Sequence, residues 1–295
     1  MKKLSVLFVL ISGTCWAGMT ICVRMLRDLG LGTLDVVLVR CAMTSLLLFL
    51  LLLITDRGKL KLKLKDLWIF ILDAVVTVLL FNYCYFRAVN SMSIAVAVVL
   101  LYISPAFVML LSALILKEKI TRQKVFALLL MLAGTIFVTG ILGSRQSVTL
   151  AGFLLGIGAA VFYAMISIIN PIAIRRGYSG ATITFYTYLF AMVGALFVAD
   201  RGLVFRTVTA SGGNFLLALG FAIVSTVLPF ILYNTALKYI EPSRAAIICS
   251  IEPIVGTLIS VFLYHEPMTA LMILGILLIM AGIICCNLKP KGSGD

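Results

Sequence analysis

Residues 97–121 read AVVLLYISPAFVMLLSALILKEKIT, and residues 245–269 read AAIICSIEPIVGTLISVFLYHEPMT. The two stretches follow one pattern 148 positions apart, and the match continues without a gap from Tyr85 to Gly134. The matched pairs are Tyr85 and Tyr233, Ala88 and Ala236, Ala97 and Ala245, Ile103 and Ile251, Pro105 and Pro253, Glu118 and Glu266, Thr121 and Thr269, Ala133 and Ala281, and Gly134 and Gly282. A shift of 147 also matches Trp16 to Tyr163 and Thr20 to Ser167. Similarity at a fixed spacing indicates an internal repeat, so we expect two related halves, residues 1–147 and 148–295.

The composition is that of a membrane protein. Of 295 residues, 63% are hydrophobic and 12% are charged, and the mean hydropathy is +1.20. A soluble domain is about half apolar and about a quarter charged, which excludes that class here. About 20 apolar residues cross the hydrocarbon core, so the chain has room for about ten spans joined by short loops. No room remains for a separate soluble catalytic domain.

Ten apolar segments are candidates for these spans. Their ranges are 4–25, 34–55, 67–88, 92–116, 122–142, 150–171, 180–199, 214–237, 243–264 and 270–288. The first begins like a signal peptide, with Lys2 and Lys3 before an apolar run, but the run is too long for a segment that is cleaved. We therefore expect an all-α membrane protein with ten transmembrane helices.

Basic residues predict how the spans are oriented. With the N-terminus in the cytoplasm, 17 of the 24 Lys and Arg residues fall on the cytoplasmic side and 6 on the outer side, while Arg40 lies within a span. Because cytoplasmic loops carry an excess of Lys and Arg, both termini are expected in the cytoplasm, in a plasma (inner) membrane of bacterial type. The net charge of +13 then reflects loops that touch lipid head groups, and we expect no nucleic-acid partner.

The repeat and the charge count agree on the topology. Each half has five expected spans, and because five is odd, the two halves must cross the membrane in opposite directions. The loop with Glu118 is basic and expected inside, whereas the matching loop with Glu266 is expected outside and has only His265 nearby. Such 5+5 inverted repeats are typical of secondary transporters.

The sequence has few residues suited to metal or nucleophilic chemistry. Its seven cysteines lie in apolar stretches, and the chain has a single histidine. We interpret the cysteines as small packing residues rather than as a disulfide framework. No metal site and no cofactor are expected.

Two prolines lie near the middle of matched spans, Pro105 in the fourth and Pro253 in the ninth. A proline has no N–H for the carbonyl four residues earlier, which here belongs to Leu101 or Cys249. A free carbonyl in lipid must face a cavity or another helix. This pairing favours two hinges at a substrate site, and kinks that only shape the packing are the alternative.

Glu252 lies directly before the second of these prolines. A carboxylate near the bilayer centre costs about 2.5–3.5 kcal/mol on insertion scales, so it is usually kept for a partner or a pathway. We predict that Glu252 binds an amino or other cationic group, or exchanges a proton. The alternative is a protonated side chain that is hydrogen-bonded within the bundle.

Two other charges, Arg40 and Asp73, lie within expected spans and are candidates for charge or proton coupling together with Glu252. Arg40 is about 9 Å from the outer end of the second span, so it can reach the interface, pair with Glu252 or bind a substrate carboxylate. Asp73 is a candidate proton site or part of an inner gate. Asp73 and Asn82 are nine positions apart, so a straight helix directs only one of them to a cavity.

Polar and aromatic side chains form stripes on two spans. Ser12, Trp16 and Thr20 recur at i, i+4 and i+8, and Tyr163, Ser167 and Asn170 recur at i, i+4 and i+7, so each set shares a helix face. Aromatic walls with a few hydroxyls suit a small organic solute, although hydrogen bonds between helices are the alternative. The expected substrate-binding residues are Trp16, Thr20, Tyr85, Tyr102, Tyr163, Ser167, Tyr233 and Glu252.

These motifs, in this order, resemble the EamA family of the drug/metabolite transporter superfamily. The first half carries Trp16, Arg40, Tyr85-Phe86-Arg87-Ala88, Ser91 through Ala97, Pro105, Glu118 and Ala133-Gly134, and the second half carries Tyr233-Asn234-Thr235-Ala236, Glu252-Pro253, Glu266 and Ala281-Gly282. The resemblance covers almost the whole chain. It implies a ten-span carrier in which spans 1, 3, 4, 6, 8 and 9 line a central cavity while spans 5 and 10 are peripheral. Relatives mostly move amino acids and other small metabolites, often outward, and Glu252 departs from the simplest family pattern.

Together these features predict a secondary-active transporter, not an enzyme, that exports small metabolites such as amino acids or amines by alternating access. Its expected partners are a small polar organic substrate and the lipid bilayer; proton coupling and a homodimer are left open. The sequence has no G-x-x-x-x-G-K-S/T motif, which disfavours ATP hydrolysis. The alternatives are an intramembrane enzyme, which the single histidine disfavours, and a non-transporting membrane scaffold, which leaves the repeat unexplained.

Overall fold

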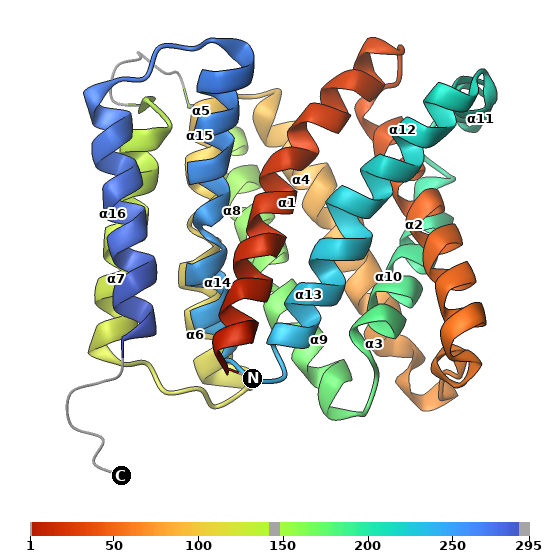
Figure 1. The fold of residues 1–295 in the computed structure, drawn as a ribbon, viewed down its shortest axis with the longest axis horizontal. Helices are drawn as coiled ribbons and strands as arrows, with labels where there is room; N and C mark the ends of the chain where they lie inside the picture. Colours follow the sequence, from red (N-terminus) through yellow and green to blue (C-terminus); the bar gives the residue numbers. More distant parts are fainter. Residues whose placement is uncertain (1, 142–147, 289–295) are drawn as a thin grey trace.

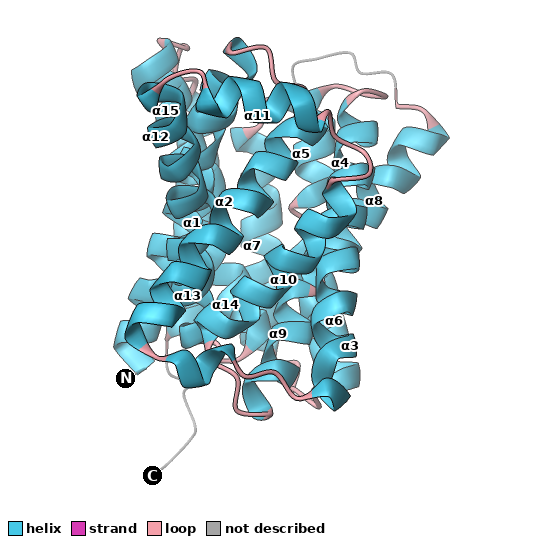
Figure 2. Ribbon diagram, turned by 90° about the vertical axis from the view of Figure 1, so that its right-hand side faces the viewer, coloured by secondary structure: helices cyan, strands magenta, loops and turns pink. Residues whose placement is uncertain are grey.

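The computed structural model describes residues 2–141 and 148–288, and within these ranges every regular element is a helix (Figures 1 and 2). The first half contains α1 (Lys2–Asp28), α2 (Thr33–Thr55), the short η1 (Arg57–Leu60) and η2 (Leu64–Asp66), α3 (Leu67–Asp73), η3 (Ala74–Leu80), α4 (Phe81–Val89), α5 (Ile94–Leu101), α6 (Ser104–Ile115) and α7 (Arg122–Val138). The second half contains α8 (Leu150–Ala164), α9 (Ile166–Arg175), α10 (Gly180–Ala195), α11 (Arg201–Thr209), α12 (Gly212–Ala222), η5 (Ile223–Val227), α13 (Leu228–Ala236), α14 (Pro242–Cys249), α15 (Ile251–Tyr264) and α16 (Ala270–Asn287).

Eight helical segments in the described ranges are long and apolar enough to cross a membrane. They are Leu4–Asp28, Thr33–Thr55, Leu64–Val89, Ile94–Ile115, Leu150–Arg175, Gly212–Ala236, Pro242–Tyr264 and Ala270–Asn287. Each corresponds to one of the ten ranges predicted from the sequence. The other two ranges correspond to α7 and α10, which have 17 and 16 residues and so lie at the lower limit of about 17 for a span.

Matched spans are interrupted at matched places. α5 ends at Leu101 and α6 begins at Ser104, just before Pro105, while α14 ends at Cys249 and α15 begins at Ile251, two residues before Pro253. A proline cannot donate to the preceding turn, which favours an interruption of the helix at this place. The π-helical segments η3 and η5 are also matched, because residues 223–227 correspond to residues 75–79 after the shift of 148.

The repeat extends to the backbone of the loops. Lys117 and His265, which are 148 positions apart, are the non-glycine residues with positive φ in the described part of the chain, at 60° and 56°. Thr121 and Thr269 each accept a backbone N–H bond at the start of the next helix, as N-cap side chains do. These two loops, α6–α7 and α15–α16, lie at opposite ends of the bundle (Figure 1).

α7 and α16 form a closely packed pair at one edge of the molecule (Figure 1). Gly134 and Gly275 meet where they cross, and a Cβ atom on either glycine would lie 2.6 Å from the carbonyl oxygen of the other. Small residues allow such close contact between membrane helices. Neither α7 nor α16 contributes a residue to the cavity described below, which fits the peripheral position expected for spans 5 and 10.

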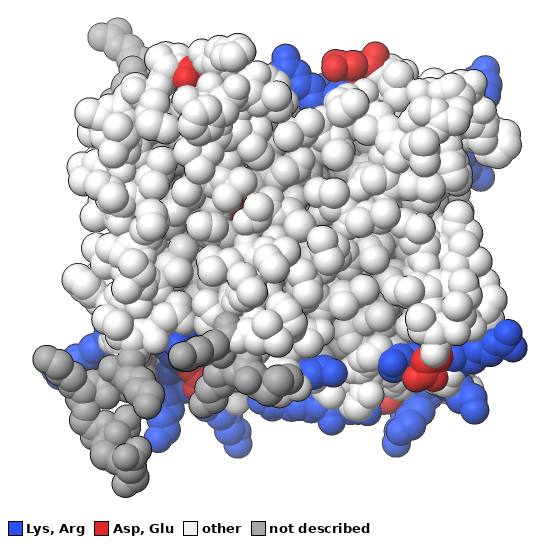
Figure 3. Space-filling model, viewed as in Figure 1, with Lys and Arg blue, Asp and Glu red and all other residues white. Residues whose placement is uncertain are grey.

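The face drawn in Figure 3 has a band that is almost free of charged atoms, between two charged edges; a small acidic spot is visible in a hollow near its middle. Lys and Arg side chains gather at the edge where α1 begins and α16 ends, as expected for a cytoplasmic face (Figures 1 and 3). Three residues of the predicted charge count, Arg145, Lys289 and Lys291, lie outside the described residues. At the opposite edge, α11 forms a short helix in what was predicted as a loop; its Val208 packs in a cluster with Leu26.

Candidate functional site

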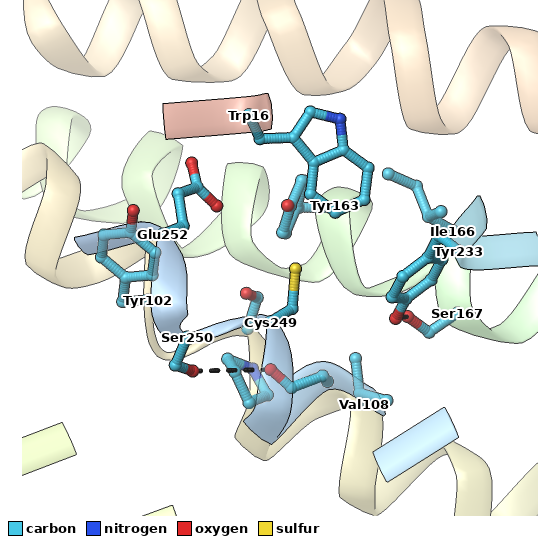
Figure 4. A pocket seen from close by; sticks show the side chains of 13 residues that line it. Trp16, Tyr102, Val108, Tyr163, Ile166, Ser167, Tyr233, Cys249, Ser250 and Glu252 are labelled. Atoms are coloured by element: carbon cyan, nitrogen blue, oxygen red, sulfur yellow. Dashed lines mark hydrogen bonds between the residues drawn. The ribbon is translucent and has the colours of Figure 1, made fainter. Parts of the chain in front are cut away.

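A cavity lies where the two interrupted helices meet, with an empty volume of about 430 Å³ that includes its open mouth. Its lining comes from both halves: α1, the α5–α6 break, α8, α9, α13, and the α14–α15 break. The lining residues are Trp16, Tyr102, Ser104, Pro105, Val108, Tyr163, Ile166, Ser167, Tyr233, Ala246, Cys249, Ser250 and Glu252. Seven of them were predicted from the sequence, and Figure 4 shows how they border one space.

The helix breaks direct polar groups into this cavity. Tyr102 and Ser250 occupy matched positions at the ends of α5 and α14, and Ser104 and Glu252 occupy matched positions at the starts of α6 and α15. A continuous helix would direct these side chains around its circumference. The interruption instead places them at one level of the helix bundle. All four line the cavity.

Glu252 is the carboxylate of the cavity. It is half-buried, and the side chain of Tyr102 lies beside it (Figure 4). None of the ion pairs among the described residues includes Glu252. A carboxylate with no protein cation at membrane depth is suited to a cationic solute or to a proton.

Aromatic rings form the wall facing Glu252. The ring centroids of Trp16 and Tyr163 are 6.5 Å apart at an interplanar angle of 70°, and those of Trp16 and Tyr233 are 5.5 Å apart. The hydroxyl oxygens of Tyr233 and Ser167 share a hydrogen bond of 2.7 Å, which ties α13 to α9. The wall is therefore held in position by ring packing and by one buried hydrogen bond.

Other members of the predicted set lie outside the lining. Thr20 is exposed and donates its hydroxyl to the carbonyl of Ala17 at 2.9 Å. Tyr85 stacks on Phe81 with ring centroids 5.9 Å apart. Pro253 is buried beneath the α14–α15 break, whereas Pro105 lines the cavity.

The two stripes also hold helices together away from the cavity. Ser12 donates its hydroxyl to the carbonyl of Pro229 at 2.9 Å, and the side chain of Asn170 donates to that of Asn234 at 2.7 Å. Both bonds are buried and join helices distant in the sequence. Ser12 and Asn170 therefore follow the alternative given for the stripes, hydrogen bonds between helices. Trp16, Tyr163 and Ser167 line the cavity.

Arg40 lies apart from Glu252. Its guanidinium carbon is 5.7 Å from the centroid of the Tyr188 ring, and its Nη1 donates to the sulfur of Met19 at 3.7 Å. Of the alternatives left open by the sequence, no ion pair with Glu252 is formed among the described residues. Arg40 is also absent from the cavity lining.

Asp73 is buried between η3 and α10, outside the cavity. It accepts hydrogen bonds from the hydroxyls of Thr187 at 2.5 Å and Thr77 at 3.1 Å. Asn82 donates its side-chain amide to the carbonyl of Val78 and also lies outside the cavity. The prediction that only one of Asp73 and Asn82 faces a cavity assumed a straight α-helix. The π-helical η3 lies between these two residues, so that assumption does not hold.

Sequence reasoning missed Ser104, Val108, Ile166, Ala246, Cys249 and Ser250 as lining residues. Two of these had a detectable signal. Ser104 matches Glu252 and Ser250 matches Tyr102 under the shift of 148, so applying the repeat to each candidate would have found both. The apolar residues had none, because any apolar side chain in a span can face a cavity, a helix or lipid. Cys249 was singled out only for its backbone carbonyl, four residues before Pro253.

At the end where α1 begins, two polar clusters join the halves. Lys124 forms ion pairs with Glu118 at 2.6 Å and with Glu241 at 2.7 Å, and Ser243 donates its hydroxyl to Glu118. This cluster connects α7 to the start of α14. The Glu118 side chain thus bonds across the two halves.

The second cluster centres on Asp66, which is buried. Asp66 accepts a hydrogen bond from the Tyr178 hydroxyl at 2.8 Å and forms an ion pair with Arg176. The Tyr178 hydroxyl in turn accepts the backbone N–H of Lys63 at 3.2 Å. The segment before α3 is thereby fastened to the α9–α10 connection of the other half.

Comparison with known proteins connects this architecture to a family. A model described as the EamA-like transporter family matches residues 3–140 and again residues 150–288. The chain belongs to the EamA-like transporter family. The resemblance inferred from the motifs is confirmed, and the two matches coincide with the two similar halves.

Relatives of this EamA-like transporter chain are also named as transporters. A protein of Archaeoglobus fulgidus named "Uncharacterized transporter" is 31% identical over 200 residues, covering 68% of this chain and 69% of the relative. A Salmonella typhimurium protein named "Probable amino-acid metabolite efflux pump" is 23% identical over 184 residues, covering 60% of this chain and 62% of the relative. A crystal structure with 16% identity has a TM-score of 0.80 over 96% of each chain, which shows a shared fold. The chain is a multi-pass membrane protein of a transporter family.

Proposed function

We propose that this protein is a secondary-active carrier that exports small polar metabolites, amines or amino acids, through the cavity between its halves. The observation that carries the proposal is that two matched helix breaks meet at one cavity containing a carboxylate. Discontinuous helices whose ends meet near the membrane midplane are a recurrent substrate site in transporters with repeated halves. Trp16, Tyr102, Tyr163, Ser167, Tyr233 and Glu252 are the proposed substrate-binding residues.

The proposed topology is ten spans arranged as a 5+5 inverted repeat, with both termini in the cytoplasm of a bacterial-type plasma membrane. The opposite positions of the matched loops around Lys117 and His265 support the inversion. The basic edge supports the orientation. A relative named as an inner membrane transporter in Escherichia coli K12 supports the membrane.

Alternating access would proceed by motion of one half against the other around the cavity. The clusters of Lys124 and Asp66 hold the cytoplasmic ends of the two halves together, so we interpret this arrangement as one closed on that side. Opening would then break these contacts, and Pro105 and Pro253 would act as hinges. For coupling to protons, Glu252 is the better candidate than Asp73, because it borders the cavity and Asp73 does not.

Counterflow in liposomes containing the purified protein tests the carrier. A thermal-shift screen against amino acids, amines and nucleosides first selects a ligand, since binding to the folded state raises the unfolding temperature. A carrier exchanges labelled ligand across the membrane only when unlabelled ligand is on the other side. Product formation would instead indicate an intramembrane enzyme, and the absence of both exchange and product would indicate a scaffold; either result would overturn the proposal.

A further inference from the structure

The cavity lining is unbalanced in charge. Glu252 is its acidic residue, and no Lys, Arg or His is among the described residues that line it. Arg40, a cation within a predicted span, lies outside the lining, over the ring of Tyr188 and against the sulfur of Met19. A substrate carboxylate entering this cavity would find no cationic side chain and would approach a like charge.

The helix breaks bring both kinds of helix end to the cavity. The prolines Pro105 and Pro253 provide no N–H for the carbonyls of Leu101 and Cys249, and Cys249 lines the cavity. The carbonyl oxygen of Cys249 packs against Gly13 of α1, where an added Cβ atom would lie 2.8 Å from it. The C-terminal ends of α5 and α14 favour positive charge and the N-terminal ends of α6 and α15 favour negative charge, so the sign of the cavity is set by its side chains.

The aromatic wall suits an organic cation. Trp16, Tyr102, Tyr163 and Tyr233 all line the space that Glu252 borders (Figure 4). The faces of aromatic rings attract ammonium groups, and the Trp ring does so most strongly. The rings also provide apolar surface that can contact the hydrocarbon part of the ligand.

We propose that the cavity selects small organic monocations, amines with an aromatic or aliphatic body and no carboxylate, with Glu252 as the counter-ion. This inference rests on the proposed function only in taking the cavity as the solute site. It narrows that proposal, because zwitterionic amino acids become poor ligands. Specificity comes from the sign of the cavity: the Glu252 carboxylate accepts an ammonium group, and it repels the carboxylate of an amino acid.

The chain contains its own reporter for a test. It has two tryptophans, Trp16 in the cavity and Trp68 on α3, where it is exposed. A Trp68→Phe variant leaves Trp16 as the remaining tryptophan, so ligand binding is followed as a change in its fluorescence. Four ligands of matched shape are titrated: phenethylamine, the neutral 2-phenylethanol, zwitterionic phenylalanine and anionic 3-phenylpropionate.

Phenethylamine is expected to bind at least tenfold more tightly than each of the other three. When Glu252→Gln is added to this variant, the affinity for phenethylamine should fall at least tenfold, while the affinity for 2-phenylethanol should change little. Glu266→Gln, an equal change at an exposed carboxylate outside the cavity, should leave the preference intact. Equal or tighter binding of phenylalanine, failure of phenethylamine to bind, or an unchanged preference in Glu252→Gln would each overturn the proposal.

The ligand series in the Trp68→Phe protein needs no change in the cavity, so the proposal stays testable even where Glu252→Gln does not fold. Counterflow separates this inference from the proposed function. Selective amine binding without counterflow of the amine would overturn the carrier and leave the cation site. Counterflow of phenylalanine without binding of phenethylamine would overturn the cation site and leave the carrier.

Discussion

The ammonium nitrogen of Lys124, in the first half of the chain, lies 2.7 Å from a carboxylate oxygen of Glu241, in the second half. The Lys124 side chain is nearly buried, and Glu118 holds it from the other side at 2.6 Å. One lysine thus joins α7 to the N-terminal end of α14. Together with the Asp66 cluster, it connects the halves at the end where α1 begins.

Replacing this lysine should loosen the closed end. Lys124→Met leaves the buried Glu118 without its cation, and an unsatisfied buried polar group costs about 1–3 kcal/mol. We expect the unfolding temperature to fall by several degrees, measured by thermal unfolding in detergent. Lys119→Met, at an exposed side chain nearby, is the control and should have no effect. The double variant Lys124→Met with Glu118→Gln should recover part of the loss; a wild-type unfolding temperature for Lys124→Met would contradict this account.

Tyr178 should contribute stability that depends on pH. Burial and its hydrogen bond to Asp66 raise the pKa of Tyr178 above its ordinary value of about 10. The contribution is therefore complete below about pH 10, where the phenol is neutral in folded and unfolded chains, and is lost as the pH rises through the raised pKa. Tyr178→Phe should lower stability by about 1 kcal/mol at pH 7, and its difference from wild type should shrink above pH 10. Thermal unfolding of both proteins from pH 7 to 11 checks this, with the exposed Tyr239→Phe as control; a constant difference would refute it.

Gly13 sets the distance between α1 and the α14–α15 break. A Cβ atom there would lie 2.5 Å from Cγ2 of Ile251 and 2.8 Å from the carbonyl oxygen of Cys249. Gly13→Ala should therefore push the helices apart, cost about 1–3 kcal/mol and weaken ligand binding near Trp16. Gly18→Ala on the same helix meets its nearest atom at 4.0 Å and should be neutral or stabilising. Unfolding temperatures that rank the two variants in the opposite order would exclude this role for Gly13.

Pro253 should affect the rate of transport more than binding. Pro253→Ala restores an N–H for the carbonyl of Cys249, which favours a continuous helix across the break. We expect slower counterflow at saturating substrate with a smaller change in affinity. Pro242→Ala, at the first turn of α14 where a missing N–H is not needed, should keep the wild-type rate. If Pro253→Ala also transports at the wild-type rate, the break does not act as a hinge.

Asp73 should act on stability rather than on the ligand. Its carboxylate accepts two threonine hydroxyls, and Asp73→Asn replaces one accepting oxygen with a donor that faces Thr187 or Thr77. A loss of about 1 kcal/mol in stability is expected, with unchanged ligand affinity. Thermal unfolding and ligand titration on the same sample measure both. A changed affinity with normal stability would instead place Asp73 in the transport pathway.

The cavity shows how far the sequence predicted the site. Tyr102 and Glu252, which were predicted to bind substrate and lie next to a helix interruption, both line the cavity; their part in binding stays a prediction. The prediction was incomplete for Ser104 and Ser250, which carry no unusual chemistry alone and become notable only as partners of those two residues in the repeat. It did not anticipate the π-helical segments or α11, which have no local signal in the sequence.

The sequence alone determined the class of the protein: long apolar runs require membrane helices, and motifs that recur 148 residues apart require two similar halves. Only the tertiary structure decided which side chains meet. Trp16 and Thr20 share a helix face, yet Trp16 lines the cavity and Thr20 bonds to its own helix. Likewise Glu252 and Arg40 are both charges within spans, and only Glu252 reaches the cavity. The helical period states which residues share a face, but the neighbour covering that face, and the depth of the cavity along it, depend on how helices distant in the sequence pack together.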